Sequence, residues 1–226
     1  MTNIRRGQKG FTLLEIIVVL AVIGSLAAML APVVFRYIDD AKRQQAQSDV
    51  NMIAASINQM YKDTGRYPFS KAGAGPNKFD GATDASVLVS QDETGACVPA
   101  ATLLVTCTSA PAATAAGWDA GFTDSLKNQL VLNTPKPGGT AGTAYPVTGQ
   151  RKWNGPYLER PSFTDPWNRP YLVNILNAAP AEESSASQKW VIVLSAGGNG
   201  IIDTVGTAPI TATVAPGGDD IIARVK

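Results

Sequence analysis

The carboxylate of Glu15 is the single charged group in the apolar run at residues 11–35. A carboxylate at the centre of a membrane-spanning helix costs about 2.5 kcal/mol or more, and such groups are retained for a function. As a helix rising 1.5 Å per residue, the run would extend roughly 37 Å, which is enough to cross the hydrocarbon core of a bilayer. We therefore interpret Glu15 as a functional residue within a membrane anchor.

The residues before this run predict its orientation. Arg5, Arg6 and Lys9 form a basic start, which the positive-inside rule places in the cytoplasm. Everything after residue 36 is then expected to be exported from a single-pass anchor. Two alternatives are a cleavable secretory signal, with small residues at 25–27 before the cut, and the apolar helix of a soluble core. The charge of Glu15 inside the run favours the anchor over both.

A second group of residues could bind a hard cation. Residues 194–203 and 217–220 combine Asp, Asn and Ser with glycine-rich turns, so side-chain oxygens and backbone carbonyls can face one point. Calcium takes six to eight such oxygen ligands in flexible geometry. The same residue types also form ordinary turns without a metal, so the pattern alone leaves both interpretations open.

Composition argues against most catalytic chemistry. The chain has no histidine, which excludes histidine-based general bases, Ser-His-Asp triads and most zinc or copper sites. No spacing indicates paired catalytic carboxylates, so we do not expect an enzyme. The formal net charge of +1 selects no nucleic acid. A calcium-dependent carbohydrate-binding module is a further alternative, although core packing is the commoner role for its aromatic candidates, Trp118, Trp153, Trp167 and Trp190.

Cys97 and Cys107 are the two cysteines of the chain, and both lie in the part expected to be exported. A disulfide closing one short loop is the favoured interpretation in an oxidising compartment. Two reduced thiols or a metal-binding pair are the alternatives. The metal pair is the weaker one, since no histidine or third cysteine is available.

The elements that position these residues indicate an α+β fold. Apolar residues from Val50 to Tyr61 recur at helical spacing, so the helix should continue beyond the membrane and end near Thr64, before Gly65. Strands are predicted at residues 171–176, 189–194 and 220–225, forming a small antiparallel sheet that covers this helix. We divide the chain into residues 1–10, a transmembrane half at 11–35, an amphipathic half with its cap at 36–68, an irregular insertion at 69–152 with one short helix near 124–132, and a C-terminal sheet region at 153–226.

The stretch from Lys9 to Glu15, with the sequence KGFTLLE, resembles the class III signal of type IV pilins and of the pseudopilins of type II secretion systems. The resemblance implies that residues 1–10 are a leader, which prepilin peptidase cuts between Gly10 and Phe11 before methylating the new terminus at Phe11. It also implies that Glu15 neutralises the terminal ammonium of a neighbouring subunit, and that the helix loosens between Gly24 and Pro32 when it packs into a filament.

Motifs near the C-terminus resemble the major pseudopilin more than a general pilin: Gly155 to Leu158, Asp165 to Trp167, Pro170-Tyr171 and Gly218 to Ile221, together with Thr64 to Pro68. The resemblance covers residues 1–68 and 153–226, and it implies a pilin fold. It also implies one structural calcium, with ligands matched to the Leu194 carbonyl, Ser195, Asn199, Asp219 and Asp220. Asp203 is added on its chemistry alone. Asn199 stands where that family commonly has Asp.

The resemblance implies a structural subunit that polymerises into a type II secretion pseudopilus and drives folded proteins across the outer membrane. Its expected partners are further copies of itself, minor pseudopilins, prepilin peptidase, the inner-membrane assembly platform and the secretin. The subunit would begin in the inner membrane with a periplasmic C-terminal domain and then join a periplasmic filament. The alternative is the major pilin of a surface type IV pilus.

Overall fold

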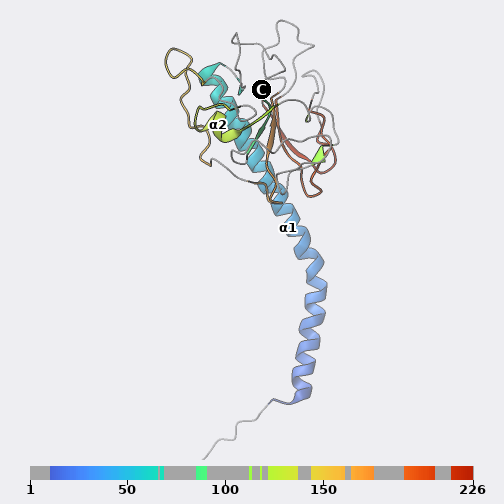
Figure 1. The fold of residues 1–226 in the computed structure, drawn as a ribbon. Helices are drawn as coiled ribbons and strands as arrows, with labels where there is room; N and C mark the ends of the chain where they lie inside the picture. The colour runs from blue at the N-terminus through green and yellow to red at the C-terminus, as the bar shows by residue number, and fades with distance from the viewer. Residues whose placement is uncertain are drawn as a thin grey trace, which may run out of the picture. The chain divides into compact units, whose positions relative to one another are not determined.

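The computed structural model describes residues 11–65, 67–68, 85–90, 112–113, 118, 122–136, 144–160, 164–175, 191–206 and 215–225. The chain divides into two compact units, Met1–Ala41 and Lys42–Lys226. The predicted leader residue Gly10 and both cysteines, Cys97 and Cys107, lie outside the described residues. Figure 1 shows the long helix α1 and the elements of the second unit.

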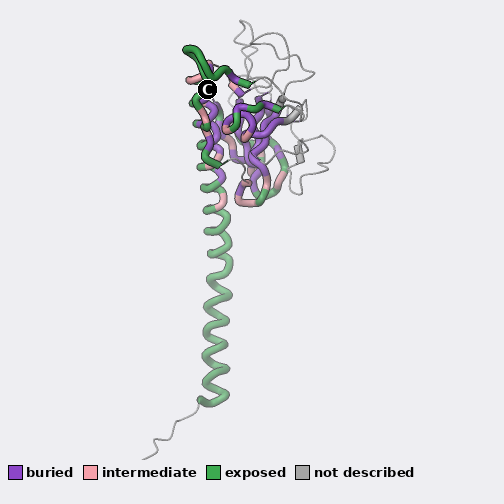
Figure 2. Tube along the Cα trace, turned by 60° about the vertical axis from the view of Figure 1, so that its left-hand side comes forward, coloured by how far each residue is buried: buried purple, intermediate pink, exposed green. Residues whose placement is uncertain are grey.

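Helix α1 spans Leu13–Thr64 and continues without interruption through Gly24 and Pro32. Its residues in the first unit are exposed, whereas one stripe is buried in the second unit (Figure 2). The buried positions of α1 recur every three to four residues, as an amphipathic helix requires: Ala46, Val50, Ile53, Ala54, Ser56, Ile57, Met60 and Thr64. The predicted helix and its buried stripe are confirmed, with one correction at Tyr61.

Tyr61 was expected in the buried stripe, but it is 41% exposed. Its ring stacks on that of Tyr67, with centroids 4.4 Å apart, so the side chain turns toward the residues that follow the helix. The helix ends as predicted: Gly65 has a φ of 69° and donates its N–H to the Tyr61 carbonyl over 2.7 Å. Glycine suits this position because it adopts positive φ without a steric penalty.

The second unit contains a five-stranded sheet in the order β3-β1-β4-β5-β7. Its strands are β1 (Ala85–Val89), β3 (Phe122–Ser125), β4 (Leu172–Asn174), β5 (Val191–Ser195) and β7 (Ile221–Val225). β1 pairs with β3 in parallel, and the remaining pairs are antiparallel, with Val193 opposite both Val173 and Ala223. A separate parallel pair joins β2 (Ala112–Ala113) to β6 (Ile201–Ile202).

Each face of the sheet has its own hydrophobic core. Val173 and Val193 face the core that includes the buried stripe of α1, whereas their neighbours Leu172 and Leu194 face a second core containing Trp118 and Ile202. Successive strand residues point to opposite faces, so burial of both faces explains why β5 is buried at every position. The sequence prediction of one covered face therefore missed the second layer.

The α+β class is confirmed, but the sheet is mixed rather than antiparallel. The predicted strands at 171–176, 189–194 and 220–225 correspond to β4, β5 and β7. Two further strands, β1 and β3, come from the segment predicted to be an irregular insertion. The helix predicted at 124–132 is the shorter α2, Leu126–Leu130, because residues 124 and 125 belong to β3 and the Ser125 hydroxyl caps α2 by accepting the Asn128 N–H over 3.1 Å.

Candidate functional site

The first candidate site is the start of α1. Thr12 caps the helix, because its hydroxyl and its carbonyl both accept the Glu15 N–H, over 3.2 and 3.1 Å. Thr-x-x-Glu is the spacing of a capping box, and an acid in the first turn interacts favourably with the helix dipole. Sequence analysis missed this capping role of Thr12, although the spacing is visible in the sequence. Phe11 is 79% exposed, and the Glu15 side chain is also exposed.

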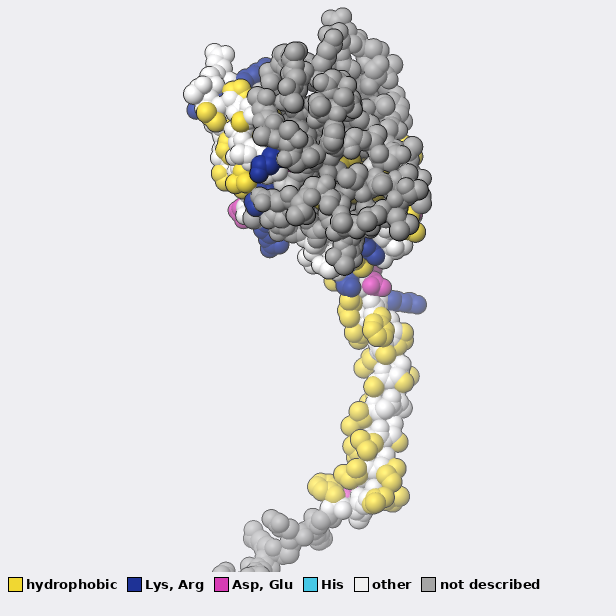
Figure 3. Space-filling model, in the orientation of Figure 1, with side chains coloured by type: hydrophobic (Ala, Val, Ile, Leu, Met, Phe, Trp, Pro, Cys, Tyr) yellow, Lys and Arg dark blue, Asp and Glu magenta, His cyan; other side chains and the backbone are white. Residues whose placement is uncertain are grey.

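The surface that follows Glu15 is apolar on all sides. Among the described residues, α1 is the one helix whose length and composition would allow it to cross a membrane, with a mean hydropathy of 2.7 over its most apolar window and none of that window buried. Figure 3 shows apolar side chains along the visible face of this part of the helix. A contiguous exposed apolar surface of this kind marks a membrane or protein interaction site. A Cβ added at Gly24 would meet no atom within 4 Å, so Gly24 is not required by packing within the subunit.

The second candidate site lies where the loop after β5 meets the loop before β7. Asp220 is 5% exposed, and its Oδ2 accepts three hydrogen bonds: from the Asp203 N–H over 2.9 Å, and from the N–H and the hydroxyl of Thr204 over 2.7 Å each. Its Oδ1 is buried and accepts no hydrogen bond from the described residues. Burial raises the pKa of Asp220, the hydrogen bonds lower it in part, and the charge of Asp203 raises it further.

Asp219 has the same arrangement. Its Oδ2 accepts the Asn199 N–H over 2.9 Å, whereas its buried Oδ1 has no partner among the described residues. Gly197 and Gly198 approach this carboxyl so closely that a Cβ at Gly197 would overlap Asp219. The Asp203 carboxyl lies against Gly218 in the same way. The two loops therefore bring Asp203, Asp219, Asp220 and the backbone of Asn199 together.

Other predicted ligands have partners of their own. The Ser195 hydroxyl donates to Oδ2 of the buried Asp165 over 2.7 Å, and the Asn199 side-chain oxygen accepts the Ile201 N–H over 2.7 Å. Leu194 lies inside β5, paired with Leu172 on one side and with Ile222 on the other. Its carbonyl therefore belongs to the sheet, where each backbone carbonyl faces a neighbouring strand.

Arg169 and Asp165 form hydrogen bonds with the end of β5 and with the loop that follows it. The Arg169 guanidinium donates to the Gly197 carbonyl, and to the Gly198 carbonyl over 3.3 Å. Oδ1 of Asp165 accepts the Arg169 N–H over 2.8 Å and the Trp167 N–H over 3.0 Å. Burial raises the pKa of Asp165, and these hydrogen bonds together with the Arg169 charge lower it in part. Sequence analysis missed this bracing because residues 165–169 are distant from the loop along the chain.

The donor set suits calcium better than a transition metal. Two carboxylate oxygens without hydrogen-bond partners, in a cradle of glycines, are hard ligands that Ca²⁺ prefers. Within the described part of the chain, no three His, Cys, Asp or Glu side chains converge closely enough to hold a metal by themselves. Backbone carbonyls and water would therefore have to complete the shell, as they commonly do around Ca²⁺.

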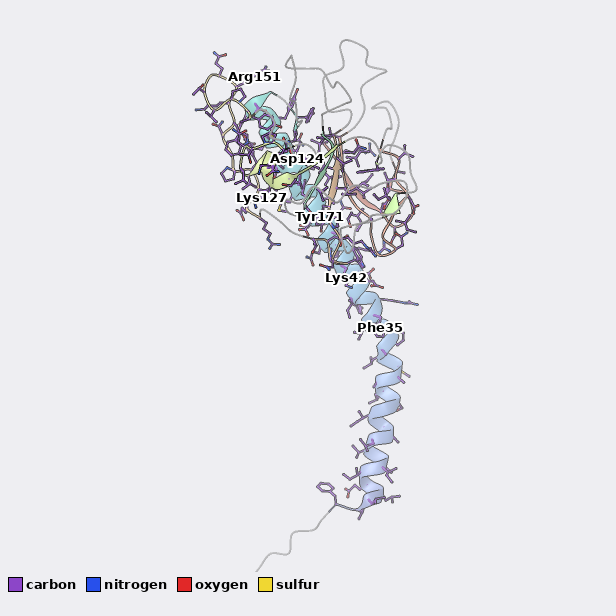
Figure 4. The ribbon with its side chains drawn as sticks, in the orientation of Figure 1. Phe35, Lys42, Asp124, Lys127, Arg151 and Tyr171 are labelled. Carbon is purple, nitrogen blue, oxygen red and sulfur yellow. The ribbon has the colours of Figure 1, made fainter. Side chains whose placement is uncertain are left out.

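Two tyrosines connect α1 to the rest of the second unit. The Tyr171 hydroxyl donates to Oδ2 of Asp49 over 2.7 Å, and the Tyr157 hydroxyl donates to Oδ2 of Asp63 over 3.0 Å. Figure 4 shows Tyr171 beside α1. Burial raises the pKa of Tyr171 most, followed by the hydrogen bond to Asp49 and its charge. Nothing in the sequence pairs these residues, since more than ninety positions separate the partners in each case.

The start of α1 matches a sequence motif of known proteins. Residues 5–31 match the family model of the prokaryotic N-terminal methylation motif. The chain is 42% identical over 69 residues to type II secretion system core protein G of Pseudomonas aeruginosa and 38% identical over 69 residues to that of Klebsiella michiganensis. Each match covers 30% of this chain and 49% of the relative, so the chain spans about half the length of these proteins.

A weaker similarity links the chain to another kind of filament protein. It is 30% identical over 89 residues to the toxin coregulated pilin of Vibrio cholerae, which covers 39% of this chain and 40% of that protein. No solved structure matches the chain. The methylation motif, the similarity to core protein G and the long helix packed on a mixed sheet agree with one another. The chain therefore resembles type IV pilin-like proteins, and among them the pseudopilins of type II secretion systems.

Proposed function

We propose that this protein is a structural subunit that polymerises into the pseudopilus of a type II secretion system, which drives folded proteins across the outer membrane. The observation that carries the proposal is the methylation motif at residues 5–31, placed at the start of a helix whose apolar surface is exposed on all sides. Such a surface needs lipid before assembly and neighbouring helices after it. The similarity to core protein G supports the secretion pseudopilus over other filaments.

Assembly would depend on charge pairing at Glu15. Prepilin peptidase would cut between Gly10 and Phe11 and methylate the new terminus, leaving an ammonium at Phe11 near the carboxylate of Glu15. Both charges are unfavourable in lipid. A neighbouring subunit, shifted along the filament axis, would bring one carboxylate to the next ammonium and set the register of packing. The Thr12 cap keeps the helix ordered up to this point, where the pairing would take place.

The segment between Gly24 and Pro32 would loosen on packing. Pro32 has no N–H for the helical hydrogen bond, and Gly24 leaves the backbone without a side chain to restrain it. The subunit as described is helical through both residues, so the loosening belongs to the filament state. It would let the helix adjust its length among its neighbours.

We further propose that the loops at 195–206 and 215–220 bind one structural calcium ion. Oδ1 of Asp219 and Oδ1 of Asp220 would contact it, with backbone carbonyls and water completing the shell and Asp203 adding negative charge beside it. When bound, calcium would neutralise the negative charge of Asp220. The buried Oδ1 of this residue has no hydrogen-bond partner among the described residues, and a buried charge without a partner is unfavourable. The residues themselves already fix the carboxyl groups through Asn199, Thr204 and the glycine cradle. Cys97 and Cys107 would form a disulfide that closes one short loop of the exported domain.

The expected partners follow from this role: copies of the same chain, minor pseudopilins, prepilin peptidase, the inner-membrane assembly platform and the secretin. The subunit would wait in the inner membrane with residues 42–226 in the periplasm. A surface type IV pilus is the second candidate function, favoured by the similarity to toxin coregulated pilin. Catalysis has no part in either role.

The decisive experiment is mass spectrometry of the mature protein purified from membranes. The proposal expects a chain that begins at Phe11 and carries one additional methyl group. A chain cut near residue 27, or one retaining residues 1–10 in a strain with active prepilin peptidase, would refute it. Electron microscopy of sheared cells then separates the two filaments, since a pilus appears as long surface fibres and a pseudopilus does not.

A further inference from the structure

A chain of buried hydrogen bonds connects Trp118 to the acidic loops at 195–206 and 215–220. The indole Nε1 of Trp118 donates to the Thr204 carbonyl oxygen over 2.7 Å, and both residues are almost fully buried. The N–H and hydroxyl of Thr204 donate to Oδ2 of Asp220, and the hydroxyl also accepts the Gly217 N–H over 2.9 Å. Thr204 thus hydrogen-bonds to Trp118, to Asp220 and to the backbone of the loop before β7.

The same segment also pairs with the strand that precedes Thr204. Ala112 and Ala113 in β2 pair in parallel with Ile201 and Ile202 in β6. Trp118 and Ile202 share the second hydrophobic core. The position of Thr204 is therefore set from two sides by residues that the sequence resemblance leaves unassigned.

The three donors on Oδ2 determine how the Asp220 carboxyl is presented. Because Oδ2 accepts the Asp203 N–H and both donors of Thr204, the plane of the carboxyl group is fixed and Oδ1 is the oxygen left for a ligand. Partners that orient a metal ligand contribute to affinity without touching the metal, and their loss typically lowers metal affinity 10- to 100-fold. Thr204 has the position and the hydrogen bonds of such a partner.

We propose that Thr204, held in place by Trp118, is a positioning residue that presents Oδ1 of Asp220 to a divalent cation, so that Trp118 supports the cation site. This inference rests on the calcium site proposed above. It gives part of the unassigned middle segment a role, because that segment supplies the indole that fixes Thr204. The cation is hard and oxygen-binding, and Ca²⁺ is the probe that tests it.

The experiment uses the full mature chain in detergent micelles, stripped with EGTA and titrated with CaCl₂ by calorimetry and by thermal melting. Thr204→Val removes the hydroxyl at nearly constant shape, and Thr204→Ser restores it. Trp118→Phe keeps an aromatic ring and removes the N–H. Tyr171→Phe is the matched control, because it also removes one side-chain hydrogen bond from the second unit but lies outside the loops.

We expect Thr204→Val to weaken calcium binding about tenfold or more and Trp118→Phe to weaken it several-fold. Thr204→Ser and Tyr171→Phe should stay within about threefold of the wild type. A role in stability alone predicts lower melting temperatures with unchanged calcium affinity, and that result would overturn the inference. If Thr204→Val fails to fold, the comparison of Trp118→Phe with Tyr171→Phe decides the question.

The two proposals fail in different ways. A wild-type chain that binds no calcium and melts identically with EGTA and with Ca²⁺ removes the calcium site, and the inference falls with it. A wild-type chain that binds calcium while Thr204→Val and Trp118→Phe bind it equally well removes the inference alone. Loss of affinity in Thr204→Val but not in Trp118→Phe would overturn the role of Trp118.

Discussion

The hydrogen bond from Tyr171 to Asp49 should make the second unit sensitive to alkaline pH. The Tyr171 side chain is fully buried, and its hydroxyl donates to Oδ2 of Asp49 on α1 over 2.7 Å. Tyr171→Phe removes that hydroxyl and keeps the ring in the core. A hydrogen bond to a charged group contributes about 1.5 to 3 kcal/mol. Since Asp49 is half-buried and water can replace part of the bond, we expect a loss of about 1 to 2 kcal/mol at neutral pH.

The pH dependence has a definite sign. The pKa of Tyr171 is raised in the folded chain above the ordinary value of 10.0, because burial and Asp49 disfavour the phenolate. Above pH 10 the unfolded chain releases this proton while the folded chain keeps it. Stability from this group is therefore complete below pH 10 and falls as pH rises, by about 1.4 kcal/mol per pH unit.

The assay is guanidinium unfolding of the full chain in detergent, followed by near-ultraviolet circular dichroism between pH 7 and pH 11. The pKa of Tyr157 is also raised, mainly by burial, so the wild-type slope alone does not isolate one tyrosine. The difference between wild type and Tyr171→Phe does. The gap between the two should close as pH rises above 10. A constant gap up to pH 11, or no gap at pH 7, would show that the bond does not stabilise the fold.

Five further substitutions at four residues test other parts of the molecule. Glu15→Ala should leave the subunit in the membrane but strongly reduce the yield of chemically cross-linked multimers on an immunoblot. Multimers at wild-type yield would contradict the charge-pairing argument. Ile57→Ala should lower the free energy of unfolding by about 2 to 5 kcal/mol, because it leaves a cavity in the core. Met52 lies on the same helix and its side chain is 38% exposed, so Met52→Ala should change the free energy of unfolding by under about 1 kcal/mol. Asp165→Ala should lower the free energy of unfolding by about 3 kcal/mol, because three hydrogen-bond donors lose their acceptor. Asp165→Asn keeps an oxygen for the two backbone donors, so it should lower the free energy of unfolding by under about 1 kcal/mol. Equal melting temperatures for the two variants would refute this.

The helix was predictable because its signal is local. The spacing of Val50, Ile53 and Ile57 predicts which face of the helix is buried, and Gly65 predicts where the helix ends. Tyr61 was misplaced because periodicity assigns it to the stripe, whereas a ring neighbour six residues later draws it outward. Spacing along a helix carries no information about a contact of that kind.

The strands from the middle segment were not predictable for a physical reason. β1 is five residues long and gains its stability from pairing with β3 and β4, which lie more than thirty and eighty positions away. A short apolar run bounded by turn residues looks the same whether it forms a central strand or a loop. Only the tertiary pairing distinguishes the two.

The acidic loops at 195–206 and 215–220 were also predictable only in part. Their Asp, Asn and Gly composition predicted a cluster of oxygen ligands. The structure places Asp203, Asp219 and Asp220 in adjoining loops, but no three carboxylates of the described residues converge closely enough to hold a metal. Composition could not tell which oxygens the protein itself would occupy. The Ser195 hydroxyl is taken by Asp165, whose turn comes thirty residues earlier, and Oδ2 of Asp220 is taken by Thr204. Long-range hydrogen bonds therefore decide which of these oxygens stay without a partner among the described residues.

Helix α1 is under two separate physical constraints. Beyond Lys42 one stripe of its apolar residues is buried within the subunit, so the hydrophobic effect of folding selects that stripe. Before Lys42 large apolar side chains such as Leu14, Leu20 and Phe35 stay 62% to 72% exposed. Folding of the subunit gains nothing from burying these residues, and in water they would favour aggregation. Their apolar character must therefore be maintained by lipid or by other subunits. This makes Glu15, the one acid of residues 11–35, a residue whose role lies outside the single chain.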